Sequence, residues 1–228
     1  MKRSIAIALC VLAAGQASAA DTLLLTGTEW SPLGSYTYAG AIQPLGRGSF
    51  GQGWVMRHWV DRLTYNYDGA QPDIHAESFG YSPALGFQRA FGSTHAGLYG
   101  ATRIAHTRLT PDDRGNSDRG TQVRFSIQAD AYTPLGDLAE NQLIAQAEIG
   151  NGGYYVRDQL LFKLLGSYKL GPEIAIKGSE EYKAWQAGAA LGGLRLGERV
   201  NLLLRGGINQ QQGQTREGYV SVELNLNL

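Results

Sequence analysis

The histidines are the first residues in this chain that could do chemistry, because imidazole binds metal ions and transfers protons near neutral pH. The four of them, His58, His75, His95 and His106, show no HxxH or HExxH spacing, and the single cysteine, Cys10, is far away in the sequence. Metal sites usually draw on ligands at such close spacings. The sequence therefore predicts no metal site, and no motif in it predicts a cofactor.

His106 also precedes an acidic, serine-containing segment, TPDDRGNSDRG. His106, either Asp112 or Asp113, and Ser117 could form the catalytic set of a small lipid-modifying outer-membrane enzyme. No nucleophile elbow or oxyanion-hole motif accompanies them. The acidic residues do not match the twelve-residue calcium loop either, and Arg114 and Arg119 lie among them. We expect a solvated loop here and no catalytic residues.

Charged residues that alternate with apolar ones give a stronger basis for function. If the apolar set faces lipid, the charged set faces the inside of a barrel, where opposite charges pair into a plug and one dominant charge selects ions. The set carries both signs, which favours a plug over an ion-selective channel. Its members, predicted to face the lumen, are Arg57, Asp61, Arg103, Arg124, Asp130, Glu148, Arg157, Lys163, Arg205 and Glu223.

Aromatic residues in the same segments offer flat surfaces that stack on sugar rings. A neutral glucan would be bound by such faces rather than by charges. Packing inside the barrel, or in girdles at the membrane surfaces, is the favoured interpretation of these residues, and glucan stacking is the alternative. The candidates are Trp59, Tyr65, Tyr67, Tyr99 and Tyr132.

Period-two alternation is the pattern that must position these side chains. The last residues, 218–228, read GYVSVELNLNL, and in residues 122–132 Val123, Phe125 and Ile127 alternate with Arg124 and Ser126. Such alternation places one set on each face of a β-strand. Further strands are predicted at residues 23–30, 36–42, 54–67, 74–89, 96–106, 142–149, 154–168, 173–177, 185–194 and 200–209.

These segments predict an all-β fold, namely a closed, antiparallel, up-and-down transmembrane β-barrel of about 12 strands, in a single domain over residues 21–228. In residues 54–67 the apolar parity switches before Tyr65, which predicts a β-bulge. Tyr154 and Tyr168, at the two ends of one predicted strand, are expected in two aromatic girdles. The final residue, Leu228, is not the aromatic residue on which many outer-membrane proteins end, so a soluble periplasmic β-protein remains the alternative.

Turn lengths predict the orientation of the barrel. An even number of strands places both termini on the periplasmic side. Residues 169–172 and 197–199 are predicted as short periplasmic turns, whereas 110–120 and 210–216 are predicted as long, polar, extracellular loops. Residues 133–141 are an exception, because they are predicted as a long turn on the periplasmic side.

The first twenty residues predict export to the outer membrane. Lys2 and Arg3 precede a short apolar run, and Ala17, Ser18 and Ala19 provide a small-residue cleavage site, so residues 1–20 are predicted to be a cleaved signal peptide. Lys plus Arg and Asp plus Glu each number 20, and this balance gives no indication of a nucleic-acid partner. The partner predicted from the alternating strands is outer-membrane lipid.

Three segments, WVMRHWVDRLTYNYDG, HAGLYGATRIAHTRLTPDDRGNSDRGTQ and LGGLRLG, carry a resemblance to a known family. From about Trp54 onward the chain resembles the cellulose biosynthesis protein BcsS family. The resemblance implies an exported outer-membrane β-barrel associated with bacterial cellulose synthesis, with cellulose or components of the synthesis machinery as partners. It brings no catalytic residue with it.

The sequence and the resemblance together predict a non-enzymatic outer-membrane barrel, accessory to cellulose biosynthesis, export or surface retention. Two alternatives remain, a small lipid-modifying outer-membrane enzyme and a narrow solute channel. The sequence leaves open whether the lumen is plugged or passable.

Overall fold

The computed structural model describes residues 22–46, 49–68, 73–150, 152–179 and 182–228. The predicted signal peptide, residues 1–20, lies outside these ranges. Within them, no helix is long and apolar enough to cross a membrane, a finding that does not bear on crossing by strands.

The described chain forms twelve β-strands, and each of the twelve predicted segments contributes to one of them. Their bounds are β1 (Leu23–Ser31), β2 (Gly34–Pro44), β3 (Gly53–Tyr67), β4 (Ile74–Phe91), β5 (Thr94–Thr110), β6 (Gly120–Leu135), β7 (Ala139–Ile149), β8 (Tyr154–Lys163), β9 (Lys169–Gly178), β10 (Lys183–Leu196), β11 (Val200–Gln211) and β12 (Glu217–Asn227).

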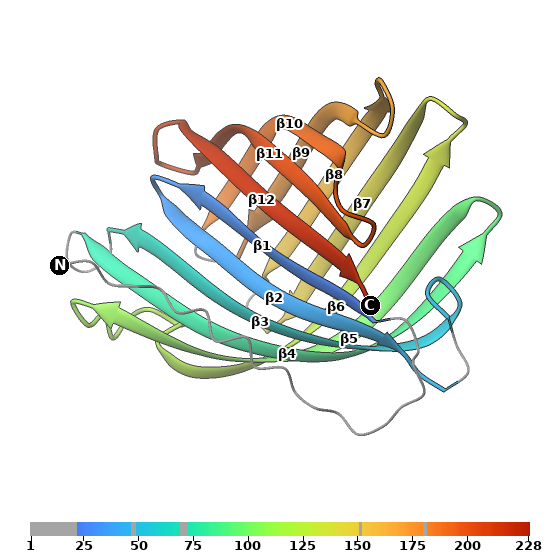
Figure 1. The fold of residues 1–228 in the computed structure, drawn as a ribbon. Helices are drawn as coiled ribbons and strands as arrows, with labels where there is room; N and C mark the ends of the chain where they lie inside the picture. Colours follow the sequence, from blue (N-terminus) through green and yellow to red (C-terminus); the bar gives the residue numbers. More distant parts are fainter. Residues whose placement is uncertain (1–21, 47–48, 69–72, 151, 180–181) are drawn as a thin grey trace.

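Every strand pairs antiparallel with its neighbour in the chain, and the sheet closes where β12 pairs with β1 (Figure 1). At this seam Leu23 lies opposite Asn227 and Trp30 lies opposite Val220. Closure leaves no strand edge unpaired. The prediction of a closed, up-and-down, antiparallel barrel of twelve strands is therefore confirmed.

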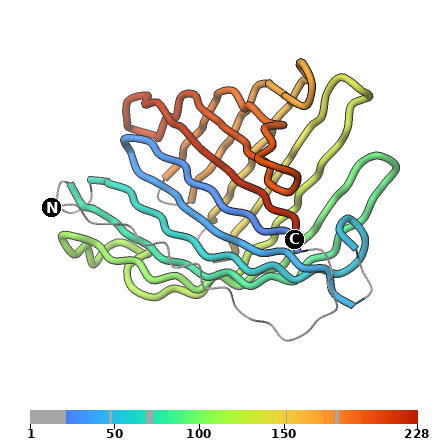
Figure 2. The backbone as a smooth tube through the Cα atoms, viewed as in Figure 1, coloured from blue at the N-terminus to red at the C-terminus, as the bar shows by residue number. Residues whose placement is uncertain are grey.

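The first and last strands begin and end at the same opening of the barrel, as the backbone trace shows for β1 and β12 (Figure 2). We call this opening the terminal end and the opposite one the loop end. The loop end carries the connection at residues 111–119, between β5 and β6, and the connection at 212–216, between β11 and β12.

The two faces of the sheet differ in polarity because side chains alternate along each strand. On β6 the apolar side chains of Val123, Phe125 and Ile127 point outward and remain more than half exposed, whereas Ser126 between them is buried inside. An apolar outer wall around a polar interior is the arrangement of a transmembrane barrel. Lipid is therefore the medium that this outer wall suits.

The predicted bulge in residues 54–67 is wrong. β3 pairs with β2 and with β4 without a shift in register over its whole length, so Tyr65 and Tyr67 point to the same face as Asp61. A register shift lies instead in β10, between Leu191 and Leu194, where Gly193 has a φ of 73°. Glycine suits that position because a left-handed φ strains other residues.

One predicted strand and two predicted turns need adjustment. β8 ends at Lys163, and Tyr168 lies in the connection to β9, so Tyr154 and Tyr168 do not belong to one strand. Residues 169–172 belong to β9 rather than to a turn. Most of residues 133–141 is strand, and the connection shrinks to 136–138, which removes the exception to the pattern of short turns at the terminal end.

Candidate functional site in the lumen

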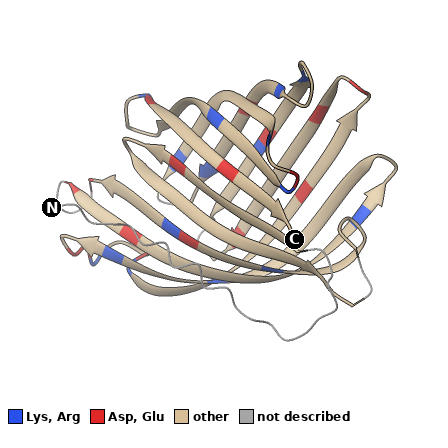
Figure 3. Cartoon of the chain, in the orientation of Figure 1, with Lys and Arg blue, Asp and Glu red and all other residues tan. Residues whose placement is uncertain are grey.

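The structure places nine of the ten predicted polar residues on the inner wall. Lys163 shares the inward parity of Arg157 and pairs with Lys169, but as the exposed last residue of β8 it lies at the rim of the terminal end rather than within the lumen. Positive and negative positions are interspersed along the strands rather than segregated by sign (Figure 3). The inward residues are Arg57 and Asp61 on β3, Arg103 on β5, Arg124 and Asp130 on β6, Glu148 on β7, Arg157 on β8, Arg205 on β11 and Glu223 on β12.

A buried ion cluster spans the lumen beside strands β8 to β12. Arg157 Nη1 lies 2.6 Å from Glu223 Oε1, and Arg205 Nη2 lies 2.8 Å from the same oxygen. Arg205 also contacts Glu173 at 3.1 Å and Glu29 of β1 at 3.5 Å. Two guanidinium groups thus meet three carboxylates. Opposite charges in such contact offset the cost of removing each group from water.

Five lumen charges were not among the residues predicted from the sequence. They complete the pairing: Lys177 Nζ lies 3.0 Å from Glu29, and Lys169 contacts Glu140. Tyr219 donates a 2.8 Å hydrogen bond to Glu173. Parity within each strand was the signal that could have found Glu173 and Lys177, because both fall on one face of β9. The five are Glu29, Glu140, Lys169, Glu173 and Lys177.

A second ion pair lies on the wall formed by β3 to β5. Arg103 Nη2 lies 2.6 Å from Asp61 Oδ2, and the Asp61 side chain is almost fully buried. Further along the same wall, Arg57 donates from Nη1 to Gln128 Oε1 at 2.9 Å. Both sides of the lumen therefore hold their charges against polar partners, and the lumen presents little net charge to a solute.

The aromatic candidates of this wall are packed against protein groups. Trp59 stacks on Tyr38 with ring centroids 4.4 Å apart and planes 16° apart, and its Nε1 donates to Tyr36 at 3.1 Å. The ring lies over Gly40, where any Cβ would overlap it. Arg57 lies between two rings, 5.8 Å from Trp59 and 4.8 Å from Tyr99. The ring faces of Trp59 and Tyr99, which the sequence suggested for sugar stacking, are therefore in contact with other side chains inside the barrel.

The remaining candidates lie toward the two openings. Tyr132 donates to Glu140 Oε2 at 2.8 Å, near the terminal end. Tyr65 and Tyr67, with centroids 5.8 Å apart, lie at the loop end beside a buried cluster of Ile74, Ala76 and Leu109. They are the candidates nearest to the loop-end opening.

The connection between β5 and β6 folds onto this opening. The hydroxyl of Tyr67 donates to Asp113 at 3.0 Å and accepts from Asn116 Nδ2 at 2.8 Å. Arg119 donates to Asp112 at 2.5 and 3.0 Å, and these bonds hold the pKa of the Asp112 carboxyl below its usual value. Side-chain bonds thus hold the loop in one arrangement over the mouth.

The lumen differs in accessibility from one side to the other. Gln159 and Gln186, on β8 and β10, are almost completely buried, so side chains fill the space beside them. Gln128 and Gln146 lie opposite each other in the middle of β6 and β7 and are only half-buried. Because both point inward, solvent reaches the middle of the barrel along β6 and β7. The lumen is therefore filled on one side and hydrated on the other.

A second observation shows how narrow the lumen is. Lys177 on β9 lies 3.0 Å from Glu29 on β1, and Arg57 on β3 lies 2.9 Å from Gln128 on β6, although neither pair of strands is adjacent in the barrel. Side chains from strands that are not neighbours therefore meet inside the barrel.

Three histidines lie outside the lumen network, whereas His95 pairs with Tyr132 near the terminal end, with ring centroids 6.4 Å apart. His106 Nδ1 lies 2.9 Å from Thr121 Oγ1 on the neighbouring strand, and Asp112 is engaged by Arg119. His58 contacts the Tyr81 hydroxyl at 2.7 Å, and His75 contacts Asn66 at 2.8 Å. Among the described residues, no group of three or more His, Cys, Asp or Glu side chains is arranged to hold a metal ion.

A closed barrel with an apolar outer wall and an ion-paired lumen defines a protein of the outer-membrane β-barrel class. Its fold is similar to that of the COG4313 outer membrane channel from Pseudomonas putida F1, with a TM-score of 0.59 and 9% identity over 92% of this chain and 96% of that chain. A family model described as cellulose biosynthesis protein BcsS matches residues 23–228, and the chain belongs to that family.

A second solved structure shares the fold. The KdgM porin in complex with disordered oligogalacturonate matches with a TM-score of 0.55 and 10% identity, over 90% of this chain and 98% of that chain. Comparison with curated protein sequences gives no match.

Proposed function

We propose that this protein is a non-enzymatic outer-membrane barrel that serves cellulose biosynthesis by assisting export of the glucan or its retention at the cell surface. Family membership supports the link to cellulose, and the barrel fold supports an outer-membrane location. The pairing of charges in the lumen is the structural observation that most strongly supports this proposal.

Charge pairing suits an uncharged polymer. In the ion cluster, Arg157 and Arg205 are compensated by Glu29, Glu173 and Glu223, so the lumen lacks the single dominant charge that attracts ionic solutes. A glucan carries no charge and is recognised through hydroxyl groups and ring faces. The half-buried amides of Gln128 and Gln146 and the tyrosines of the loop end supply such contacts. Cellulose is therefore a better match to this interior than an ion or a charged sugar.

The experiment that tests this role is deletion of the gene in a cellulose-producing strain, with the wild-type chain restored in a matched strain. We expect the deletion strain to lose surface-retained cellulose or to form altered fibres, and the restored strain to recover. Unchanged yield, fibre morphology and surface retention in the deletion strain would contradict the proposed role.

A narrow solute channel is the second candidate, because solvent reaches Gln128 and Gln146 in the middle of the barrel. Conductance in planar bilayers distinguishes it. The accessory role predicts a low conductance without ion selectivity, whereas a large, stable, selective conductance would favour the channel.

The lipid-modifying enzyme has less support, because His106 and Asp112, two groups that it needs, are hydrogen-bonded to Thr121 and Arg119. The non-enzymatic role predicts that the combined substitutions H106A and S117A leave the lipid profile of the cells unchanged. An altered lipid profile would favour the enzyme.

A further inference from the structure

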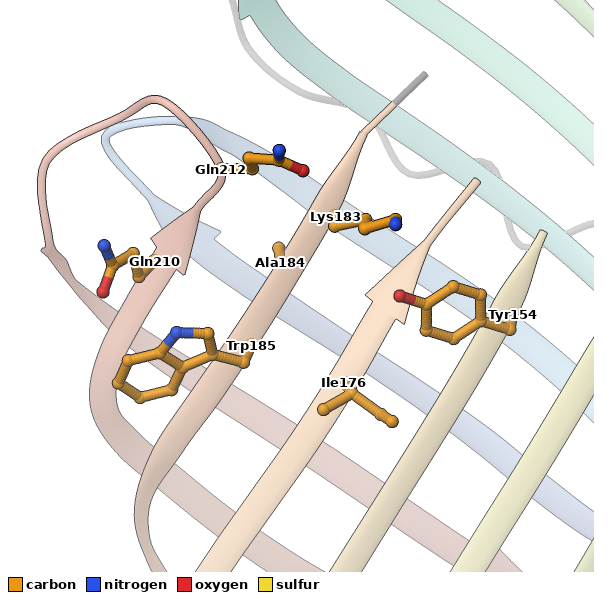
Figure 4. Close-up of a pocket in the computed structure, with 7 residues that line it drawn as sticks. All are labelled: Tyr154, Ile176, Lys183, Ala184, Trp185, Gln210 and Gln212. Carbon is orange, nitrogen blue, oxygen red and sulfur yellow. The ribbon is translucent and has the colours of Figure 1, made fainter. Parts of the chain in front are cut away.

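A pocket of about 390 Å³ lies in the outer wall at the loop end, across strands β8 to β11. Tyr154, Ile176 and Trp185 form its apolar part, and Lys183, Gln210 and Gln212 form its polar part (Figure 4). The pocket is open to the surroundings of the barrel and lies apart from the lumen. None of its residues takes part in the ion cluster.

The register of the sheet explains how the apolar part is built. Trp185 on β10 lies between Ile176 on β9 and Gln210 on β11, its partners on the two neighbouring strands, so all three side chains stand on the outer face. Tyr154 lies opposite Gly178, which adds no side chain to the wall. Trp and Tyr at such positions are typical of the boundary between hydrocarbon and headgroups. This part of the pocket suits a hydrocarbon chain.

Two cations lie at the polar part, one lining the pocket and one beside it. Arg216 lies over the Trp185 ring, 5.8 Å from the ring to Cζ, and its Nε donates to Gln210 Oε1 at 3.1 Å. Lys183 is an exposed residue that lines the pocket, whereas Arg216 lies beside the lining residues Trp185 and Gln210. Within the described ranges neither cation forms a salt bridge, in contrast to the lumen cations Arg157 and Arg205. Neither positive charge is therefore compensated by a carboxylate of the barrel, and both can meet an anion from the membrane surface.

We propose that this pocket binds a phosphorylated membrane lipid, with the phosphate between Lys183 and Arg216 and an acyl chain against Trp185 and Ile176. Each surface cation strengthens the binding of an anionic lipid by roughly fivefold. The apolar contacts distinguish a lipid from free phosphate, because inorganic phosphate gains nothing from Trp185 or Ile176. The proposal concerns the outer wall and does not depend on the role in cellulose biosynthesis.

The terminal end provides a matched control. There a pocket of similar volume, about 390 Å³, is lined by Phe87 and Arg89 among others, and Arg89 lies 5.3 Å from the Phe91 ring. It offers the same type of cation and aromatic contact at the other side of the barrel, with one cation in place of two.

Native mass spectrometry of the full chain in a neutral detergent tests the proposal, with lipid A carrying two phosphates as the probe. We expect a single bound lipid, a loss of affinity of roughly fivefold for K183Q or R216Q, and roughly thirtyfold for the double variant. K183R should keep most of the binding, and R89Q should leave it unchanged. Inorganic phosphate at the same concentration should not displace the lipid.

Several outcomes would overturn it. Unchanged affinity in the double variant would show that the two cations do not bind the lipid, and equal loss in R89Q would show a non-specific charge effect. Equal binding of dephosphorylated lipid A would remove the role of the phosphate. Displacement by inorganic phosphate would show a phosphate site rather than a lipid site. Retention of the compact, heat-modifiable band on gels verifies that each variant is folded.

Discussion

Glu223 is the residue whose neutralisation should most disturb the barrel, because it forms ion pairs with both buried arginines. The substitution E223Q keeps the size of the side chain and removes its charge. Arg205 then retains Glu173 at 3.1 Å and Glu29 at 3.5 Å, whereas Arg157 loses the carboxylate at 2.6 Å. Arg157 is only 8% exposed, so water cannot replace that partner.

The expected cost follows from this geometry. Removing one partner of a buried ion pair costs about 3–5 kcal/mol because the other charge stays buried without compensation. Only one of the two arginines is left without a carboxylate, so we expect E223Q to lower the free energy of unfolding by about 3 kcal/mol. In the double variant R157Q/E223Q no unpaired charge remains. The double variant should therefore lose less free energy of unfolding than the losses in R157Q and E223Q added together.

Urea unfolding of the refolded protein in lipid vesicles, followed by tryptophan fluorescence, measures these differences. E77Q is the matched control, since Glu77 pairs with Arg62 at 2.6 Å on the outer face with both side chains partly exposed. Such exposed pairs contribute about 0.2–1 kcal/mol. Equal effects of E223Q and E77Q, or strict additivity in the double variant, would refute the assignment of a buried, coupled cluster.

Three further predictions concern the lumen wall and the loop. G40A should lower the free energy of unfolding by about 1–3 kcal/mol, because its Cβ would overlap the Trp59 ring, and an unchanged urea midpoint would contradict that packing. Y67F removes the hydroxyl that joins Asp113 and Asn116. Trypsin should therefore cut the loop at residues 111–119 roughly tenfold faster than in wild type. An equal rate of cleavage would show that these bonds do not hold the loop. NMR titration should give Asp112 a pKa below the usual 3.8, rising toward it in R119Q. Because the pKa of Asp112 is lowered in the folded protein, its contribution to loop stability is fully present above the usual pKa and is lost as the pH falls through the lowered pKa. The same titration midpoint in wild type and R119Q would contradict the pairing.

Alternation predicted the strands well wherever the outer face meets lipid. In β6, Val123, Phe125 and Ile127 face outward as expected. The prediction was wrong near the loop end of β3, where the outward residues Arg62, Thr64 and Asn66 are polar. A strand that extends beyond the apolar band keeps its hydrogen-bond register but loses its hydrophobic alternation. That loss imitates a bulge when only the sequence is read.

The turn after β8 shows the opposite error. Leu164 and Tyr168 continue the apolar parity of Phe162 into the connection, so the sequence predicts one long strand where the chain turns back. Exposed apolar residues in a turn at the membrane surface follow from the same lipid contact that shapes the wall.

Partners across the lumen were beyond the reach of the sequence. Arg157 and Glu223 are 66 residues apart, and Glu29 lies 148 residues from Lys177. Parity assigns such residues to the inner wall, but only the closure of the sheet and the register of every strand determine which charges meet. For this reason the candidate lumen residues could be named from the sequence, whereas their pairing into a cluster could not.

The amount of cellulose retained per cell is the measurement that tests the central proposal most directly. It compares a strain without this chain and the same strain with the chain restored, while cellulose synthase activity in isolated membranes serves as the internal reference. An accessory barrel predicts less retained cellulose without the chain at equal synthase activity. Equal retention in the two strains would contradict the proposed function.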